Sequence, residues 1–498
     1  MSLRLSLVSG CAAILLLGGA GPVALQAREG WLADYRTLKS ELENQYANLS
    51  WFASPEGGRD LPALDRNTTA ALERASTEDE ARTALLAFQA AFKDGHFVGR
   101  PALAPASGES PEPEWPDLKA GDEAARACLA LGYGGATVAF SLPIETLPGF
   151  VLETDGDGTP FRSGIVTSGT ERVGIVRIPS FAMENYPALC RQSWNAEGVD
   201  QGGDVNQSAL ERAITKAWYA ELAALLRSFE MRGVDALMVD IGGNGGGDDS
   251  GDMATRLFSG QPLRSSPLLI KRGPAAETYL KEQLEQVDYG LSLKPDAAGA
   301  QLLSQARGQL ASQPVTLPPT HCDLSWVWWE QRPWNPSGSC SDLVQIGTAG
   351  GPLATLAADA IPQPRIARRL SWSIDAKDHW GAWTGPVYVL VDGRTASSAE
   401  MFAATLQNNG VAKVMGVPSA GAGCGAMGPD GRVVLAATQM VFSFPTCVRL
   451  RPDGSDEVAG LTPDILLRPT QGESRRARAA RLFRSIEADR QEASATSR

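Results

Sequence analysis

The amino-terminal part of the sequence has apolar residues at helical spacing. Positions 31, 35, 38, 42, 46 and 49 are apolar, and the segment 76–94 repeats this spacing after an acidic first turn. Apolar residues three or four positions apart lie on one face of a helix. We therefore expect a helical module that ends in a loop marked by Gly95 and Pro101.

The middle and the end of the chain repeat a different unit, in which a strand, a turn and a helix follow one another. Residues 234–241, VDALMVDI, form an unbroken apolar run after a long helical pattern and before the glycine-rich segment 242–247. The apolar run 386–391 likewise leads into a turn and a helical pattern after Ser397, and 411–417 is a further strand pattern. Continuous apolar strands are typical of parallel sheets covered by helices on both faces. The sequence thus predicts an α/β fold with a mainly parallel sheet and crossover helices.

These patterns divide the chain into seven segments. Shorter strand patterns at 136–140, 149–154 and 172–178 separate the helical module from the first unit, and residues 101–118 are rich in Pro, Ser and Glu, which favours a linker. In chain order we expect a signal peptide at 1–27, the helical module at 28–100, a linker and short β region at 101–171, the first half of the core at 172–260, a tryptophan-rich insertion at 261–384, the second half of the core at 385–470, and a charged helix or tail at 471–498.

The first residues indicate export. Arg4 precedes an apolar run that ends in small residues near Ala27, which is typical of a secretory signal. No later apolar stretch has the length of a membrane span. We therefore expect a periplasmic or extracellular protein without a membrane span.

The cysteines agree with an oxidising compartment. Seven are present, and six remain once Cys11 leaves with the signal. Their pairing does not follow from the sequence, although Cys322 with Cys340 and Cys424 with Cys447 are the nearest closures.

Charge and residue types narrow the classes of partner. The chain has 45 basic and 57 acidic residues, a formal charge of −12, and no basic stripe with interleaved aromatics, so we expect no nucleic-acid partner. Only three histidines and no C-x-x-C pair are present, so we expect no metal site and no cofactor. The oligomeric state does not follow from the sequence.

The insertion is notable for its aromatic content. Such density suits a substrate groove, but a satellite core is the favoured interpretation, because tryptophans bury large areas. The residues concerned are Trp326, Trp328, Trp329, Trp334, Trp372, Trp380 and Trp383.

Ser397 has two possible roles. The segment Ser397 to Glu400 has the form of a capping box, in which the serine hydroxyl caps a helix and the glutamate reaches back. A serine at this turn is also well placed for acyl transfer, because helix-terminal N–H groups can stabilise an oxyanion. A serine nucleophile needs a base, and His96, in the loop DGHF, suits that role better than His321 or His379.

Three segments resemble the C-terminal processing proteases and their relatives, the tricorn-core serine peptidases. They are ALMVDIGGNGGG, VYVLVDGRTASSAEMFAATLQNNG and EVAGLTPDILL, and the resemblance covers residues 172–260 and 386–468. Many relatives carry a PDZ domain before the core, but residues 119–170 lack its glycine-rich loop, so that module is absent or degenerate here.

The resemblance implies specific roles. Ser397 falls on the family's nucleophile, whereas the lysine of the processing proteases is replaced by Ala422. The tricorn-like branch uses a histidine of an Asp-x-His loop and a late glutamate instead, which are His96 and Glu457 here. Asp456 is a neighbouring alternative to Glu457.

The implied mechanism is that of a serine endopeptidase. Ser397 attacks, His96 acts as general base and then acid, and Glu457 orients the imidazole and stabilises its charge. By the same resemblance, the backbone N–H groups of Gly246 and Ser398 form the oxyanion hole. The expected substrate is a peptide or unfolded protein, and the alternative is a non-catalytic ligand-binding protein on the same fold.

Overall fold

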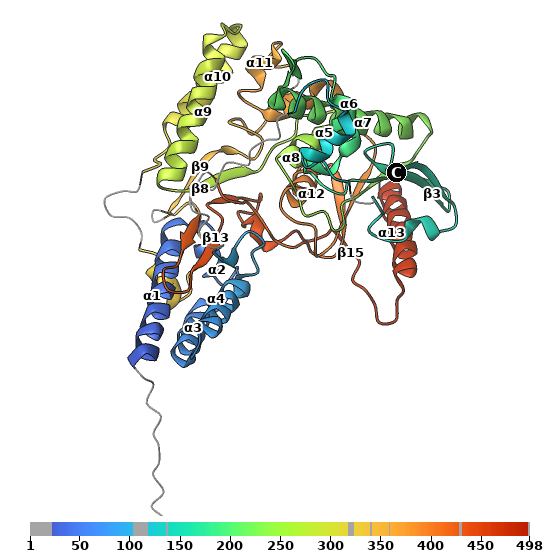
Figure 1. Ribbon diagram of the computed structural model, residues 1–498. Helices are drawn as coiled ribbons and strands as arrows, with labels where there is room; N and C mark the ends of the chain where they lie inside the picture. The colour runs from blue at the N-terminus through green and yellow to red at the C-terminus, as the bar shows by residue number, and fades with distance from the viewer. Residues whose placement is uncertain are drawn as a thin grey trace, which may run out of the picture.

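The centre of the computed structural model is a seven-stranded sheet in the order β15-β11-β10-β7-β4-β3-β2 (Figure 1). The structure describes residues 22–102, 118–135, 138–316, 323–338, 341–357, 359–427 and 431–496. The strands are β2 Phe150–Asp155, β3 Arg162–Ser168, β4 Glu171–Arg177, β7 Ala236–Asp240, β10 Val387–Val391, β11 Ala412–Gly416 and β15 Ile465–Leu466. Strands β15, β11, β10, β7 and β4 run parallel, whereas β3 and β2 join antiparallel at one edge. The predicted mainly parallel α/β sheet is confirmed.

The edge strands β2 and β3 extend the sheet beyond the core predicted from the sequence. Because β2 and β3 belong to the central sheet, the sheet begins before residue 172. The strand predicted at 136–140 does not form in its described part, 138–140. The chain there is held instead by the next residue, since the Ser141 N–H donates to Asp240 Oδ2 at 2.6 Å.

Alternate residues of the parallel strands enter two different cores. Val387, Val389 and Val391 of β10 face the core that contains α7 Gln207–Met231 and α12 Ser398–Asn408. Tyr388 and Leu390 face the core beneath α13 Arg475–Thr496. This period-2 pattern explains the unbroken apolar runs, because both faces of the sheet are covered.

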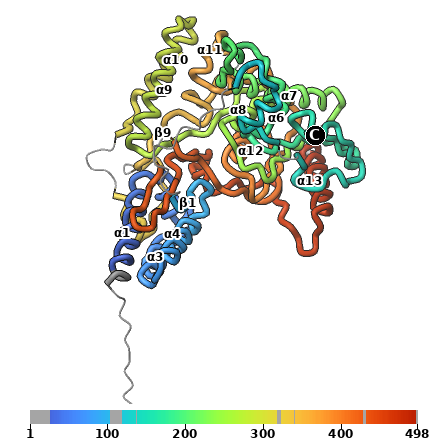
Figure 2. The backbone as a smooth tube through the Cα atoms, viewed as in Figure 1, coloured from blue at the N-terminus to red at the C-terminus, as the bar shows by residue number. Residues whose placement is uncertain are grey.

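The amino-terminal helices form a separate core against the carboxyl-terminal half of the chain. They are α1 Pro22–Gln45, α2 Leu49–Phe52, α3 Leu61–Arg74 and α4 Glu78–Phe92. The predicted apolar positions from 31 to 49 are all buried there. After α4, β1 Val98–Pro101 pairs antiparallel with β13 Met440–Ser443, which also pairs with β12 Arg432–Val434. Figure 2 shows the blue helices and β1 beside this late part of the chain. The loop between α4 and β1 is thereby brought to the core.

The insertion builds a satellite core, and it also completes the amino-terminal one. A three-stranded sheet, β14 Cys447–Arg449, β8 Pro267–Lys271 and β9 Leu343–Thr348, packs with the helical hairpin α9 Pro274–Ser292 and α10 Ala297–Ala311. Trp326 and Trp328 are buried against the amino-terminal helices, whereas Trp329 is exposed.

Among the described residues, two disulfides link segments that are separated in sequence. Cys128 pairs with Cys190, and Cys424 pairs with Cys447 as the sequence suggested. Cys322 and Cys340 lie outside the described residues. The remaining short elements are α5 Ala124–Ala130, α6 Pro187–Ser193, β5 Asp200–Gln201, β6 Asp204–Val205, α8 Ser250–Ala254 and α11 Pro364–Ala367. Within the described ranges, every helix is too short or too polar to cross a membrane.

Candidate active site

Ser397 occupies a constrained turn between β10 and α12. Its φ of 55° lies in the left-handed region, which costs a residue other than glycine about 1–3 kcal/mol. Gly246 packs directly against it, since a Cβ added to Gly246 would lie 2.8 Å from Ser397 Cβ. The glycine loop therefore has to be free of side chains where it meets the serine.

Glu400 connects this turn to a second loop. Its carboxylate accepts the Ser397 N–H at 2.9 Å, as the capping box predicts. The same carboxylate accepts the N–H groups of Gly421 at 2.8 Å and Ala422 at 2.9 Å, and the Ser419 hydroxyl. Burial raises the pKa of Glu400, and the hydrogen bonds oppose that shift. The cap and the candidate nucleophile are thus parts of one arrangement.

The His96 ring is held by the loop that Glu400 fixes. Its Nδ1 lies 2.7 Å from the Ala422 carbonyl oxygen, 326 residues away in sequence. A carbonyl oxygen only accepts hydrogen bonds, so Nδ1 carries the proton and Nε2 of the neutral ring is free to accept one. Ala422 thus contributes its backbone carbonyl, which orients the imidazole.

Asp94 anchors the loop that carries His96. Its carboxylate accepts the His96 N–H at 2.8 Å, the Tyr46 hydroxyl at 2.8 Å and the Asn48 side-chain amide at 3.1 Å. Burial raises the pKa of Asp94, and the hydrogen bond from the His96 backbone opposes this. The carboxylate thereby ties the loop to two residues that follow the end of α1.

Glu457 is buried in an ion pair with Arg449. Both side chains are almost inaccessible, and Arg449 Nε donates to Glu457 Oε2. Arg449 also donates to the Gly423 carbonyl at 2.9 Å, next to Ala422. The Cys424–Cys447 disulfide joins the same loop to β14, where Arg449 lies.

Asp456, the alternative to Glu457, has a different state. It is fully buried, its Oδ1 accepts the Val458 N–H at 3.0 Å, and its Oδ2 has no partner. Burial raises its pKa to about 8, and Asp94 and Glu457 add to the shift. Asp456 is therefore neutral near pH 7, whereas Glu457 has a cationic partner.

The structure gathers the predicted catalytic residues around the loop 419–425. A continuous path of hydrogen bonds runs from Ser397 through Glu400 and Ala422 to His96. Among the described residues, however, no hydrogen bond joins His96 to the Ser397 hydroxyl or to Glu457. Catalytic hydrogen bonds are often long before substrate binds.

The two backbone N–H groups expected to form the oxyanion hole differ in their hydrogen bonding. Ser398 provides the first N–H of α12, one of those that a helix leaves without an internal partner. The Gly246 N–H already donates to Asn244 Oδ1 at 2.8 Å. The Ser398 hydroxyl donates to the Asp248 carbonyl, which holds the glycine loop against the helix.

Lys413 lies away from this arrangement. It occupies the amino end of β11 opposite Tyr388, whereas Ser397 follows the carboxyl end of the parallel strand β10. Its ammonium group pairs with Asp489 of α13. In the part of the chain that is described, no cluster of three or more His, Cys, Asp or Glu side chains is arranged to hold a metal ion.

Sequence reasoning missed four contributors to this site. Glu400 was visible only as a helix cap, and Asp94 only as the first residue of the DGH loop. The Ala422 carbonyl carries no sequence signal, because every residue has one. Arg449 is one polar residue in a short apolar strand, which does indicate a buried partner.

Comparison with known proteins agrees with this geometry. A model of peptidase family S41 matches residues 172–467. Mature CPAF aligns over 93% of this chain and 97% of its own, with a TM-score of 0.56 and 16% identity. Mature CPAF complexed with lactacystin aligns over 93% and 98%, with a TM-score of 0.53 and 14% identity. A search of curated proteins found no match.

These findings define the class of the protein. It is a serine peptidase, a hydrolase of peptide bonds. The family model covers more than half of the chain, and the chain belongs to peptidase family S41.

Proposed function

We propose that this peptidase is an exported endopeptidase in which Ser397 is the nucleophile, His96 the general base and Glu457 the charge-stabilising carboxylate. The observation that carries the proposal is the hydrogen bond from His96 Nδ1 to the Ala422 carbonyl. It brings an imidazole from the amino-terminal module to the loop that Glu400 attaches to Ser397.

The proposed reaction proceeds through an acyl-enzyme. His96 Nε2 takes the Ser397 proton as the hydroxyl oxygen attacks the peptide carbonyl carbon, and the imidazolium then protonates the leaving amine. A water molecule, deprotonated by the same nitrogen, releases the acyl group. The Ser398 N–H stabilises the oxyanion, and the Gly246 N–H joins it by exchanging its bond to Asn244.

Two carboxylates support His96 in different ways. Asp94 fixes the backbone of the loop, and Glu457 contributes negative charge from the buried pair with Arg449. We assign this role to Glu457 rather than Asp456, because burial keeps Asp456 neutral near pH 7.

Two features support export of the protein, and the family resemblance supports a peptide substrate. Residues 1–27 have the pattern of a signal peptide, and both disulfides agree with an oxidising compartment. Peptides and unfolded segments are the substrates that the tricorn-like resemblance implies. The seven-segment division of the chain remains our proposal for its organisation, with the sheet extended to β2 and β3.

The test combines labelling with turnover. We expect a fluorophosphonate probe to label the wild type but not Ser397→Ala. His96→Ala should cut casein at least about 100-fold more slowly than the wild type, because general base catalysis contributes that much. Lys413→Met, at the amino end of β11 where Lys413 pairs with Asp489, is the matched control and should retain full activity. Wild-type rates in His96→Ala, or loss of activity in folded Lys413→Met, would contradict the proposed base.

A further inference from the structure

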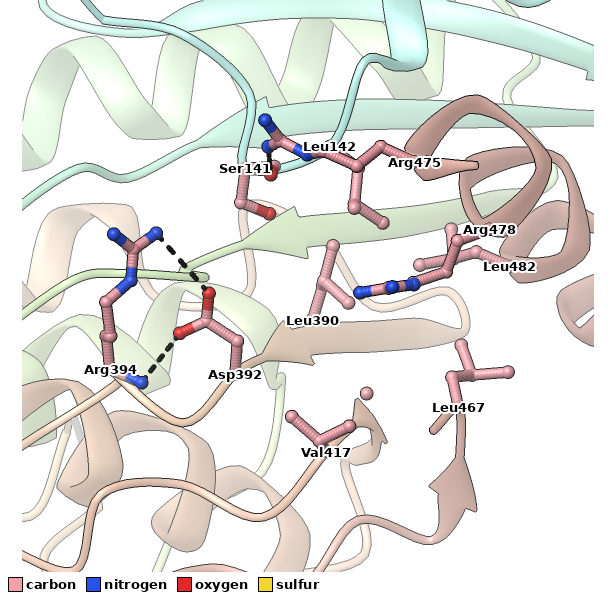
Figure 3. A pocket seen from close by; sticks show the side chains of 11 residues that line it. Ser141, Leu142, Leu390, Asp392, Arg394, Val417, Leu467, Arg475, Arg478 and Leu482 are labelled. Carbon is pink, nitrogen blue, oxygen red and sulfur yellow. Dashed lines mark hydrogen bonds and ion pairs between the residues drawn. The ribbon is translucent and has the colours of Figure 1, made fainter. Parts of the chain in front are cut away.

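A cavity of about 270 Å³ opens on the face of the sheet that α13 covers (Figure 3). Its floor is Leu390 at the carboxyl end of β10 and Gly416 at the end of β11. Arg475 and Arg478 line it from α13, and Arg394 lines it from the turn that follows β10. Neither the family resemblance nor the proposed reaction uses this cavity.

Arg478 is the central cationic group of the cavity. Its side chain extends from α13 toward Leu390 in Figure 3, and its Nε is buried without a hydrogen-bond partner. A Glu473 oxygen lies 3.7 Å from that nitrogen, beyond hydrogen-bonding distance, and Glu473 receives two hydrogen bonds of 2.8 Å from Arg481. A buried guanidinium nitrogen without an acceptor is costly, and a bound oxyanion would supply one.

The other polar groups of the cavity leave an excess of positive charge. Arg475 donates to the Ser141 carbonyl at 2.7 Å, and it forms no ion pair with a described carboxylate. Asp392 lies 3.9 Å from Arg394, but its carboxylate also accepts the Gly243 and Arg394 N–H groups at 2.9 Å. Three guanidinium groups thus line the cavity with one carboxylate, Asp392. Asp392 pairs with Arg394, and Glu473 pairs with Arg478, but both carboxylates also accept shorter hydrogen bonds from other groups.

The rest of the lining is aliphatic. Leu142, Leu390, Val417, Leu467 and Leu482 complete the lining. An inorganic anion would leave this surface in contact with water, whereas a ligand with an aliphatic group would bury it. A site with a cationic end and an aliphatic wall suits a molecule that combines a carboxylate with a short hydrocarbon group.

We infer that this cavity binds an aliphatic carboxylate, with the carboxylate on Arg478 and the hydrocarbon group against the leucines. The last residue of a peptide with a free carboxyl end and a free aliphatic acid share this chemistry. The inference concerns binding alone, so failure of the proposed catalytic residues would not contradict it.

The test measures binding to the full chain by calorimetry. We expect N-acetyl-leucine to bind, and N-acetyl-leucinamide, which lacks the charge, to bind at least about tenfold more weakly, because hydrogen bonds to charged groups contribute that much. Arg478→Met, which keeps an aliphatic stem, should weaken N-acetyl-leucine by a similar factor. Arg484→Met, exposed on the same helix, is the matched control and should bind as the wild type does.

Two further ligands identify the source of the carboxylate. Stronger binding of N-acetyl-leucine than of hexanoate would assign the site to peptide ends, and equal binding would assign it to aliphatic acids in general. Inorganic phosphate that binds as well as either would overturn the role of the leucines. Undiminished binding by Arg478→Met, or no binding of any carboxylate to the wild type, would overturn the inference. If Arg478→Met does not fold, Arg478→Lys, which keeps the charge but removes the Nε–H donor, provides the comparison.

Discussion

The two halves of the candidate active site are built in different ways. Ser397 lies in a short turn whose own helix supplies Glu400, three residues away, to hold its backbone. His96 comes from the amino-terminal module, and its ring is attached to the loop 419–425 by a bond to Ala422. The proposed nucleophile is therefore positioned locally, whereas the proposed base is positioned by tertiary structure.

Because of this difference, the positions of Ser397 and His96 depend on different parts of the fold. Local bonds keep Ser397 in its turn as long as β10 and α12 form. The position of His96 depends also on Asp94, on the pairing of β1 with β13 and on the packing of four helices. Substitutions in the two halves should consequently have different effects on activity and stability.

Outside the proposed triad, the largest effect on activity should follow from Glu400→Gln, which affects both halves at once. A glutamine amide would place a donor against N–H groups that now donate to the carboxylate, at Ser397, Gly421 or Ala422. We expect kcat/KM to fall about 100-fold, equivalent to about 2.7 kcal/mol. Steady-state assays on casein-derived peptides would measure it. Glu230→Gln, exposed at the end of α7, is the control, and equal rates in the two variants would refute the role of Glu400.

A smaller effect should follow from Tyr46→Phe, which loosens only the histidine half. The change removes one of the three hydrogen bonds to Asp94. We expect a loss of about 1 kcal/mol in the free energy of unfolding and about a tenfold lower kcat with nearly unchanged KM.

The matched control for Tyr46→Phe is Tyr35→Phe. Tyr35 lies in the same module and donates to Asp65 at 2.9 Å, away from the histidine loop. It should lose similar stability by chemical denaturation while keeping full activity. If both variants lose activity together, the effect is one of general stability rather than of loop position.

The smallest effect on activity should come from Asp456→Asn, which changes pH dependence. In the folded state the Asp456 pKa is about 8, so the folded protein keeps a proton that the unfolded chain releases above its ordinary value near 4. Stability from this group is therefore present at low pH and declines as the pH rises toward 8, by up to about 1.4 kcal/mol per pH unit. Asparagine cannot titrate, so the variant should lose this decline. Denaturation curves between pH 5 and 8 would show it, and parallel pH profiles for the two proteins would disprove the shift.

The sequence predicts the elements that depend on local patterns better than the contacts between residues far apart in the chain. The parallel strands, α7 and α12, and the capping box at Ser397 follow from hydrophobic period and turn chemistry. The positions of His96 and Glu457 around one loop do not, because no local pattern reports contacts over hundreds of residues. His96 was indicated by its loop and by a family resemblance, whereas its bond to the Ala422 carbonyl required the structure.

The ion pair of Arg449 with Glu457 is another contact that the sequence does not predict. Each residue is visible as a charge in the sequence, but their burial depends on the disulfide-linked loop and on β14. The cavity beneath α13 likewise combines side chains from three parts of the chain that have no shared motif.

The pairing of β1 with β13 has a consequence for biosynthesis. It joins residues 98–101 to residues 440–443, so the first part of the chain has to wait for nearly the last before it docks. Contacts so distant in sequence form late and slowly. A polypeptide still emerging from the ribosome therefore has not yet brought His96 to Ser397, and we expect the proposed activity to arise only when synthesis is almost complete.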